Sequence, residues 1–218
     1  MKPDTFRWAS LAVVGLWLRL LSVLALTAFV VWRAGAGLWL TLPDLLGSTA
    51  ALALWTPLIA DLLHGRTVLT TDPRRRALSA LYPWLIAFEA ALWGLWLLNV
   101  LVGGLPEANP VAVAALVTAW GAGIVVSFLV YLLSLRLMAN PADSTGFSQL
   151  ADLFNLAAAL AAASLVMNVV PLKGAAAPTV ADQWAYGLAG AVEVLSWLLL
   201  HRALARPESP ESKKQPQV

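Results

Sequence analysis

The sequence contains no cysteine and has few charged residues. The lack of cysteine excludes disulfide bonds, thiolate metal sites and cysteine nucleophiles, although it does not identify the compartment. Only 12% of the residues are charged, whereas a soluble globular domain has about a quarter. The net charge of +2 is too small and too scattered for a nucleic-acid-binding surface. Nucleic acid is therefore not an expected partner.

Motifs for nucleotide binding and hydrolysis are also absent. The chain has no glycine-rich phosphate loop, no GxSxG and no HExxH. Instead, 60% of its residues are hydrophobic, and the mean hydropathy is +0.77. The apolar residues form runs that reach the ~18 residues typical of a membrane-spanning helix, without the period-two alternation of a membrane barrel. The sequence therefore predicts an integral membrane protein with the lipid bilayer as its surroundings.

The apolar runs predict an all-α, polytopic bundle of six transmembrane helices. We expect this bundle to occupy residues 1–205 and a disordered cytoplasmic tail to occupy residues 206–218. The expected spans are residues 8–32, 45–63, 78–104, 111–135, 149–172 and 182–205. The second span is short and contains Pro57, which removes a helical hydrogen bond. If this span re-enters rather than crosses, the bundle has five spans.

Two acidic residues mark expected helix starts. Asp44 can cap the second span. Thr71-Asp72-Pro73 combines an N-cap residue with a proline in the first turn. The third helix is therefore expected to begin at this motif, before its apolar part.

The basic residues predict the orientation. With both termini in the cytoplasm, eleven basic residues lie inside and two outside, as the positive-inside rule requires. The inside set is Lys2, Arg7, Arg66, Arg74, Arg75, Arg76, Arg136, Arg202, Arg206, Lys213 and Lys214, and the outside set is Arg33 and Lys173. We therefore expect a multi-pass protein of the inner (cytoplasmic) membrane with both termini in the cytoplasm.

An internal repeat is suggested by three residues that recur at a constant offset of 104. Tyr82, Glu89 and Trp93 of the third span correspond to Tyr186, Glu193 and Trp197 of the sixth. Two units of three spans would have opposite orientations, the inverted-repeat arrangement of many transporters. The alternative is a chance match, because the fourth span has no counterpart of Arg19.

Three ionisable residues are expected at similar depth near the membrane midplane. Arg19, Glu89 and Glu193 lie near the middles of the first, third and sixth spans. Charges at this depth are costly and usually functional, so we consider a site for a cation, a proton or a polar solute. The alternative is a structural ion pair between Arg19 and one glutamate. The candidate binding residues are Arg19, Glu89, Glu193, Tyr82, Tyr186, Trp93 and Trp197.

Metal binding has weaker support, and no cofactor is expected. Asp61 and His64 have the i, i+3 spacing of metal ligands in helical bundles, and His201 is expected at the same membrane edge. The alternative is that all three are ordinary polar residues at the interface. We therefore treat them as weak candidates only.

The fifth span combines polar and small residues. Asp152, Asn155 and Asn168 interrupt it, and residues 157–163 are rich in alanine. Small side chains allow helices to approach closely. We therefore expect this span to lie inside the bundle and Ala159→Leu to overpack it.

These features lead to two functional hypotheses. The first is a small transporter or channel-like permease with a polar site at the midplane. The second is a non-catalytic accessory or assembly subunit of a larger membrane complex or homo-oligomer. The sequence offers little for catalysis, so an enzyme is the third alternative.

Overall fold

A computed structural model describes residues 3–34, 42–103, 110–169 and 179–205. The regular structure in these ranges is entirely helical and comprises six helices. They are α1 (Pro3–Ala34), α2 (Leu42–Leu63), α3 (Pro73–Gly103), α4 (Pro110–Ala139), α5 (Ser144–Val169) and α6 (Val180–Leu204). Each contains a segment long and apolar enough to cross a membrane. The predicted all-α, six-span class is confirmed.

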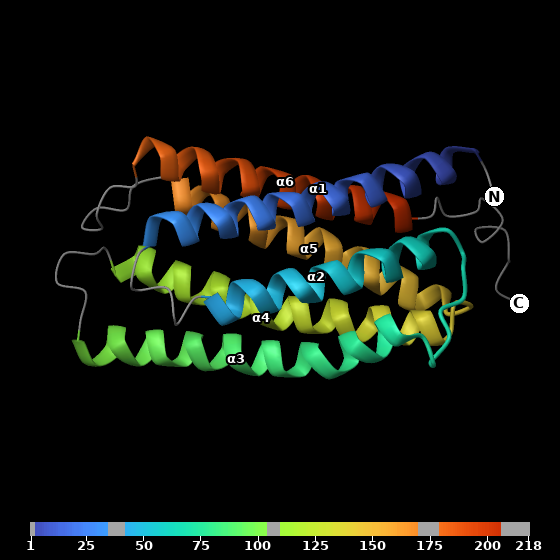
Figure 1. Cartoon of the computed structure of the whole chain (residues 1–218), viewed down its shortest axis with the longest axis horizontal. Coiled ribbons are helices and arrows are strands. Elements are labelled where there is room, and N and C mark those ends of the chain that lie inside the picture. The colour runs from blue at the N-terminus through green and yellow to red at the C-terminus, as the bar shows by residue number, and fades with distance from the viewer. Residues whose placement is uncertain (1–2, 35–41, 104–109, 170–178, 206–218) are drawn as a thin grey trace, which may run out of the picture.

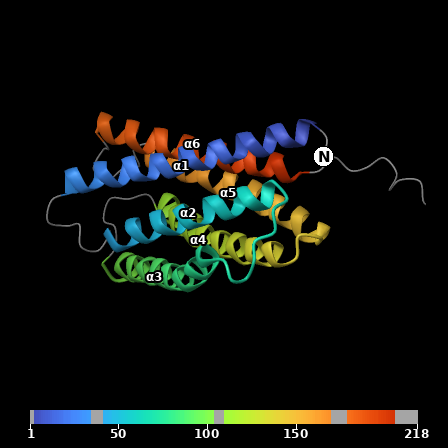
Figure 2. The same cartoon turned by 45° about the vertical axis from the view of Figure 1, so that its right-hand side comes forward.

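The helices form a closed ring. Each helix packs against the next in the chain, and α6 packs against α1 to close the ring. Figures 1 and 2 show the six rods side by side, with the first and last helices adjacent. The start of α1 and the end of α6 lie at the same end of the bundle (Figure 1), as an even number of crossings requires. We refer to this end as the terminal end and to the other as the open end.

Capping explains several helix boundaries. The Asp72 carboxylate accepts a bond of 2.8 Å from the backbone N–H of Arg74, so the predicted start of α3 is confirmed. The Asp143 carboxylate likewise accepts a bond of 2.9 Å from Gly146, and α5 therefore begins at Ser144, earlier than expected. The expected cap at Asp44 is wrong, because α2 begins at Leu42 and already includes this residue.

Ion pairs at the terminal end join helices and connections. Asp61 pairs with Arg66 and Arg74, and Arg136 pairs with Asp143. The side-chain hydrogen bond from Arg74 is the main cause that lowers the pKa of Asp72 below its ordinary value. These contacts give several of the basic residues a structural role in addition to any role in orientation.

The alanine-rich part of α5 is buried on one face only. Ala157, Ala158 and Ala161 are buried among other helices, as expected for small residues in a bundle. Ala159 is instead exposed on the outer face, together with Asp152. The expectation that Ala159→Leu would overpack the bundle is therefore wrong, because this side chain points away from it.

The two halves of the bundle pack differently. Most buried side chains of the helices lie in the half nearer the terminal end or within one turn of the helix midpoint, and Thr27 and Ala161 lie further into the other half. The segments that contain the others are residues 9–20, 51–63, 78–85, 124–138, 147–158 and 196–204. The remaining described side chains of the other half are half-buried or exposed. The bundle is therefore tightly packed at the terminal end and loosely packed at the open end.

The outer surface is apolar. Large hydrophobic side chains are exposed on all six helices, including Trp32, Leu46 and Trp84 at the first three. Leu129, Val166 and Leu188 are examples from the other three helices. Such a belt suits contact with lipid acyl chains. The polar groups at mid-depth face the interior instead.

Candidate functional site

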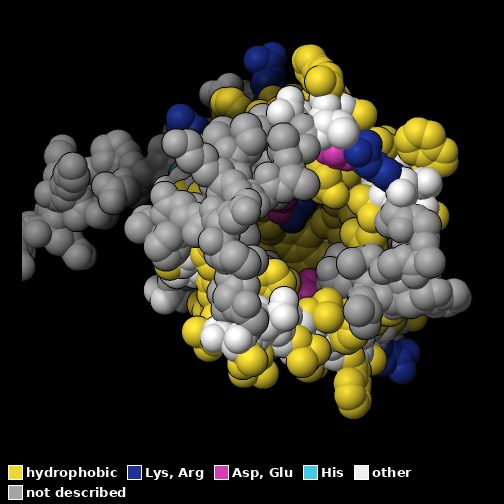
Figure 3. Space-filling view, turned by 90° about the vertical axis from the view of Figure 1, so that its left-hand side faces the viewer, with side chains coloured by type: hydrophobic (Ala, Val, Ile, Leu, Met, Phe, Trp, Pro, Cys, Tyr) yellow, Lys and Arg dark blue, Asp and Glu magenta, His cyan; other side chains and the backbone are white. Residues whose placement is uncertain are grey.

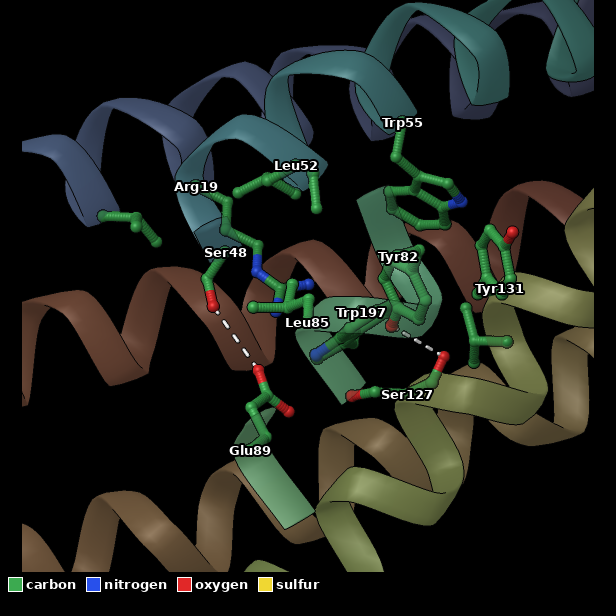
Figure 4. A pocket seen from close by; sticks show the side chains of 13 residues that line it. Arg19, Ser48, Leu52, Trp55, Tyr82, Leu85, Glu89, Ser127, Tyr131 and Trp197 are labelled. Carbon is green, nitrogen blue, oxygen red and sulfur yellow. Dashed lines mark hydrogen bonds between the residues drawn. The ribbon is translucent and has the colours of Figure 1, made fainter. Parts of the chain in front are cut away.

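A cavity of about 160 Å³ lies inside the ring at mid-depth. Five helices contribute to its wall: Arg19 and Val23 from α1, Ser48, Ala51, Leu52 and Trp55 from α2, Tyr82, Leu85 and Glu89 from α3, Ser127, Val130 and Tyr131 from α4, and Trp197 from α6. Figure 4 shows the rings of Trp55, Tyr82 and Tyr131 gathered on one side of the Arg19 guanidinium. Polar and aromatic groups therefore converge here from distant parts of the chain.

A second cavity of about 220 Å³ adjoins the first. Glu89, Ser127 and Trp197 belong to the walls of both cavities. The second cavity adds Glu193 from α6 and Ala157 from α5, so the two together are lined by all six helices. Figure 3, seen from the open end, shows a hollow with acidic and basic side chains deep inside it.

Arg19 is held by α6. Its Nη2 atom donates a hydrogen bond to Oε1 of Glu193, and the two form an ion pair. The guanidinium also lies over the Trp197 ring, 4.2 Å from its centroid. The Arg19 side chain is 15% exposed and that of Glu193 is 38% exposed. The hypothesis that Arg19 contacts one of the two glutamates is confirmed, and the partner is Glu193.

The indole N–H of Trp197 strengthens this arrangement. It donates a bond of 3.3 Å to the same Glu193 oxygen that accepts from Arg19. The Nε and Nη1 atoms of Arg19 are buried and have no hydrogen-bond partner among the described residues. A buried donor without an acceptor costs roughly 1–3 kcal/mol. Among the described residues, the guanidinium is therefore hydrogen-bonded through Nη2, and its other two nitrogens remain available to water or a solute in the cavity.

Glu89 lies across the ring from this pair, on α3. Its Oε1 atom accepts a hydrogen bond of 3.4 Å from the hydroxyl of Ser48 on α2 (Figure 4). Because Glu89 lines both cavities, a molecule in either one would meet its carboxylate.

The aromatic residues of the wall are themselves well anchored. The Tyr82 hydroxyl donates a bond of 2.9 Å to the carbonyl oxygen of Ser127, and its ring stacks on Tyr131 with 4.1 Å between centroids (Figure 4). Trp55 is 7% exposed and contacts Trp197, with 6.0 Å between ring centroids. The Trp55 indole N–H is buried without a hydrogen-bond partner among the described residues.

Two of the seven candidate residues lie away from the cavities. The indole N–H of Trp93 donates a bond of 3.0 Å to the carbonyl oxygen of Val117, so this ring packs between α3 and α4. Tyr186 is half-buried on α6 and belongs to neither cavity wall. Of the three repeated pairs, only Glu89 and Glu193 both face the cavities. The inverted repeat stays a prediction.

The weak metal candidates are engaged in other contacts. Asp61 carries the ion pairs to two arginines described above. The His64 ring lies 2.7 Å from the carbonyl oxygen of Ala60, and the His201 ring lies 2.8 Å from that of Ala151. Within the described ranges no three acidic or histidine side chains gather as metal ligands would.

Sequence reasoning missed several residues of the wall. Ser48, Trp55, Ser127 and Tyr131 line the first cavity, and Gly123 lines the second. Serine, glycine and aromatic residues are common in transmembrane helices for reasons of packing, so their types carry no signal for a cavity. Their spacing along α2 and α4 indicates a cavity wall only once the positions of Arg19 and Glu89 show which face of each helix points into the bundle.

The fold and cavities define a multi-pass helical membrane protein with a polar, aromatic-lined interior. Comparisons of the chain with known protein families, with curated proteins and with solved structures gave no match.

Proposed function

We propose that the protein is a small permease that moves a polar solute across the cytoplasmic membrane by alternating access. The observation that carries this proposal is the contrast between the two halves of the ring. Polar cavities lie at mid-depth below a hollow at the open end (Figure 3), and the half between them and the terminal end is tightly packed. A carrier that is open to one side only has this shape.

The distribution of arginine supports an outward-facing assignment for the open end. Within the described ranges, the terminal end carries seven arginines: Arg7, Arg66, Arg74, Arg75, Arg76, Arg136 and Arg202. Arg33 lies at the open end, where it pairs with Asp182. The positive-inside rule then directs the terminal end to the cytoplasm. In this orientation the cavities face the outside.

The energetics of buried charge favour a site over a structural ion pair. Besides the ion pair of Arg19 with Glu193, the ring places a second carboxylate, that of Glu89, in the walls of both cavities. Ionisable groups at membrane depth are retained where they act on ions or solutes. The belt of large apolar side chains on all six helices also suits a protein surrounded by lipid.

The accessory-subunit alternative draws on one observation. Asp152 and Asn155 are exposed on the outer face of α5, three residues apart and therefore on adjacent parts of one helix face. Such a polar pair could contact a helix of a partner protein. In this alternative the interior would be static, and the following experiment separates the two functions.

The absence of cysteine makes a labelling test direct. Gly123 and Ser134 lie eleven residues apart, about three turns, on one face of α4. Gly123 lines the second cavity, and an added Cβ would meet no atom within 4 Å. Ser134 is 0% exposed in the packed half. Single variants Gly123→Cys and Ser134→Cys therefore report on the open and packed halves.

A membrane-impermeant thiol reagent is then applied to either side of oriented vesicles. We expect Gly123→Cys to react from the outside. In a permease, Ser134→Cys reacts from the cytoplasmic side whenever the protein adopts its inward-facing state. Its labelling rate then rises as that of Gly123→Cys falls. A Ser134→Cys side chain that is inert from both sides under all conditions contradicts alternating access.

A further inference from the structure

We propose that the solute is a small organic cation of the guanidinium or primary-amine type, held by Glu89 among the aromatic side chains of the cavities. This inference rests on the proposed permease function and specifies its substrate class. Three features of the molecule support an organic cation: the way in which the bundle binds the Arg19 guanidinium, the space beside Glu89, and the chemistry of the cavity wall.

The Arg19 side chain shows how this interior binds an organic cation. A carboxylate, that of Glu193, accepts a hydrogen bond from the guanidinium, and an aromatic face, that of Trp197, lies 4.2 Å from it. Both interactions are favourable for a cation that is withdrawn from water. A second carboxylate with aromatic neighbours at the same depth is therefore suited to the same kind of group.

Glu89 provides that second carboxylate. It lies 104 residues before Glu193, and the position 104 residues after Arg19 is Gly123 of α4. Gly123 lines the cavity that contains both glutamates, and the space where its side chain would lie is open. Where α1 carries an arginine, α4 thus carries a glycine and leaves room for a solute in the cavity that contains both glutamates.

The size of the space fits a small molecule. The two cavities measure about 160 and 220 Å³, far more than the roughly 10–15 Å³ that one water molecule requires. The glycine and the small residues Ala119 and Ser127 recur every four residues along this face of α4 and keep the space clear.

The chemistry of the wall favours a cation over an anion. Two glutamates and one arginine line the cavities, so the carboxylates outnumber the guanidinium there. The rings of Trp55, Tyr82 and Tyr131 line the same cavity as Glu89, at the other side of it in Figure 4. Aromatic faces attract cations, particularly where water is excluded.

The same wall disfavours a bare metal ion. Calcium takes about six to eight oxygen ligands, and magnesium retains an octahedral shell. Besides Glu89, the two walls supply the Glu193 carboxylate, which is paired with Arg19, and the hydroxyl groups of three serines and two tyrosines. An organic cation needs fewer oxygen contacts, because its apolar atoms pack against the rings.

The test is equilibrium binding of radiolabelled guanidinium to the purified full-length protein in lipid nanodiscs. We expect saturable binding that unlabelled methylguanidinium and ethylammonium displace and that benzoate does not. Glu89→Gln should weaken binding by about tenfold or more. Asp152→Asn is the matched control, because it removes a carboxylate from the outer face of α5, and it should leave binding unchanged.

A second pair of variants tests the space rather than the charge. Gly123→Leu should fill the second cavity and abolish binding. Gly94→Leu on α3 is its control, because the place of a Cβ there is also open but lies in neither cavity wall. Thermal unfolding of each variant identifies those that fold, and Gly123→Leu decides the question if Glu89→Gln does not.

The binding experiment tests the cation site, whereas the labelling experiment tests the permease function, so the two can fail separately. The proposed cation site is wrong if guanidinium shows no saturable binding or if benzoate binds in its place. It is also wrong if a site variant and its matched control bind guanidinium equally well. Saturable guanidinium binding combined with an inert Ser134→Cys side chain would retain the cation site and reject the permease. Labelling from both sides without guanidinium binding would retain the permease and reject the cation.

Discussion

Replacing Arg19 by leucine and Glu193 by glutamine, singly and together, measures how strongly their ion pair holds α1 to α6. Arg19→Leu leaves the Glu193 carboxylate without its cation and removes the guanidinium from the face of Trp197. Glu193→Gln removes the carboxylate that is paired with the guanidinium. Because each single change leaves a charge behind, the double variant should be less destabilised than the sum of the two single variants.

The size of this coupling follows from the burial of the two groups. A hydrogen bond to a charged group contributes about 1.5–3 kcal/mol, whereas fully exposed ion pairs contribute less than about 1 kcal/mol. The Arg19 side chain is mostly buried, but that of Glu193 keeps 38% of its surface. We therefore expect a coupling of about 2 kcal/mol, between these limits.

The assay is reversible unfolding in mixed micelles, followed by circular dichroism. A second cycle, with Arg19→Leu and Glu89→Gln, is the comparison, because the ion pair of Arg19 is with Glu193, whereas Glu89 accepts a hydrogen bond from Ser48. This second coupling should be clearly smaller than the first. Equal couplings in the two cycles, or none with Glu193, would refute the assignment of Glu193 as the partner of Arg19.

Two further predictions concern packing and pH. Ala158, 4% exposed, faces other helices, so Ala158→Leu should cost about 1–3 kcal/mol, whereas Ala159→Leu on the outer face should change the free energy of unfolding by less than about 0.5 kcal/mol. Thermal unfolding of both variants checks this, and equal losses would contradict the assigned faces. Arg74 lowers the pKa of Asp72 in the folded state. The stability that Asp72 contributes is therefore complete above its ordinary value of 3.8 and is lost as pH falls through the lower, folded pKa. Asp72→Asn should flatten this part of the stability profile, and an unchanged profile would show that the pair with Arg74 is unimportant in solution.

Sequence patterns predicted the features that depend on position along a helix. Hydropathy revealed the six helices, and Asp72 followed by Pro73 marked the start of α3. The middle positions of Arg19, Glu89 and Glu193 predicted a shared depth, and all three line the cavities. Each of these properties can be read from distance along the chain.

Properties that depend on helix rotation were not accessible in the same way. Arg19 could reach either glutamate at its depth, and only the packing of α6 against α1 selects Glu193. The alanine-rich run of α5 has apolar residues on every side, so its periodicity does not distinguish Ala158 from Ala159. In a membrane, lipid and protein both accept apolar side chains, and the usual contrast between inner and outer faces is weak.

The difference between the packed and open halves was also hidden, for a related reason. Both halves of every helix are apolar, and hydropathy does not report which half has neighbours. The unsatisfied donors of Arg19 and Trp55 lie at the cavity wall, where the packed half gives way to the open one. A cavity of this size has room for water or a bound solute that accepts hydrogen bonds from these donors. On α2, Pro57 follows Trp55 closely and removes one backbone hydrogen bond at the same level, which eases bending there. Under the proposed permease function, this level of the bundle is where the two packings would differ.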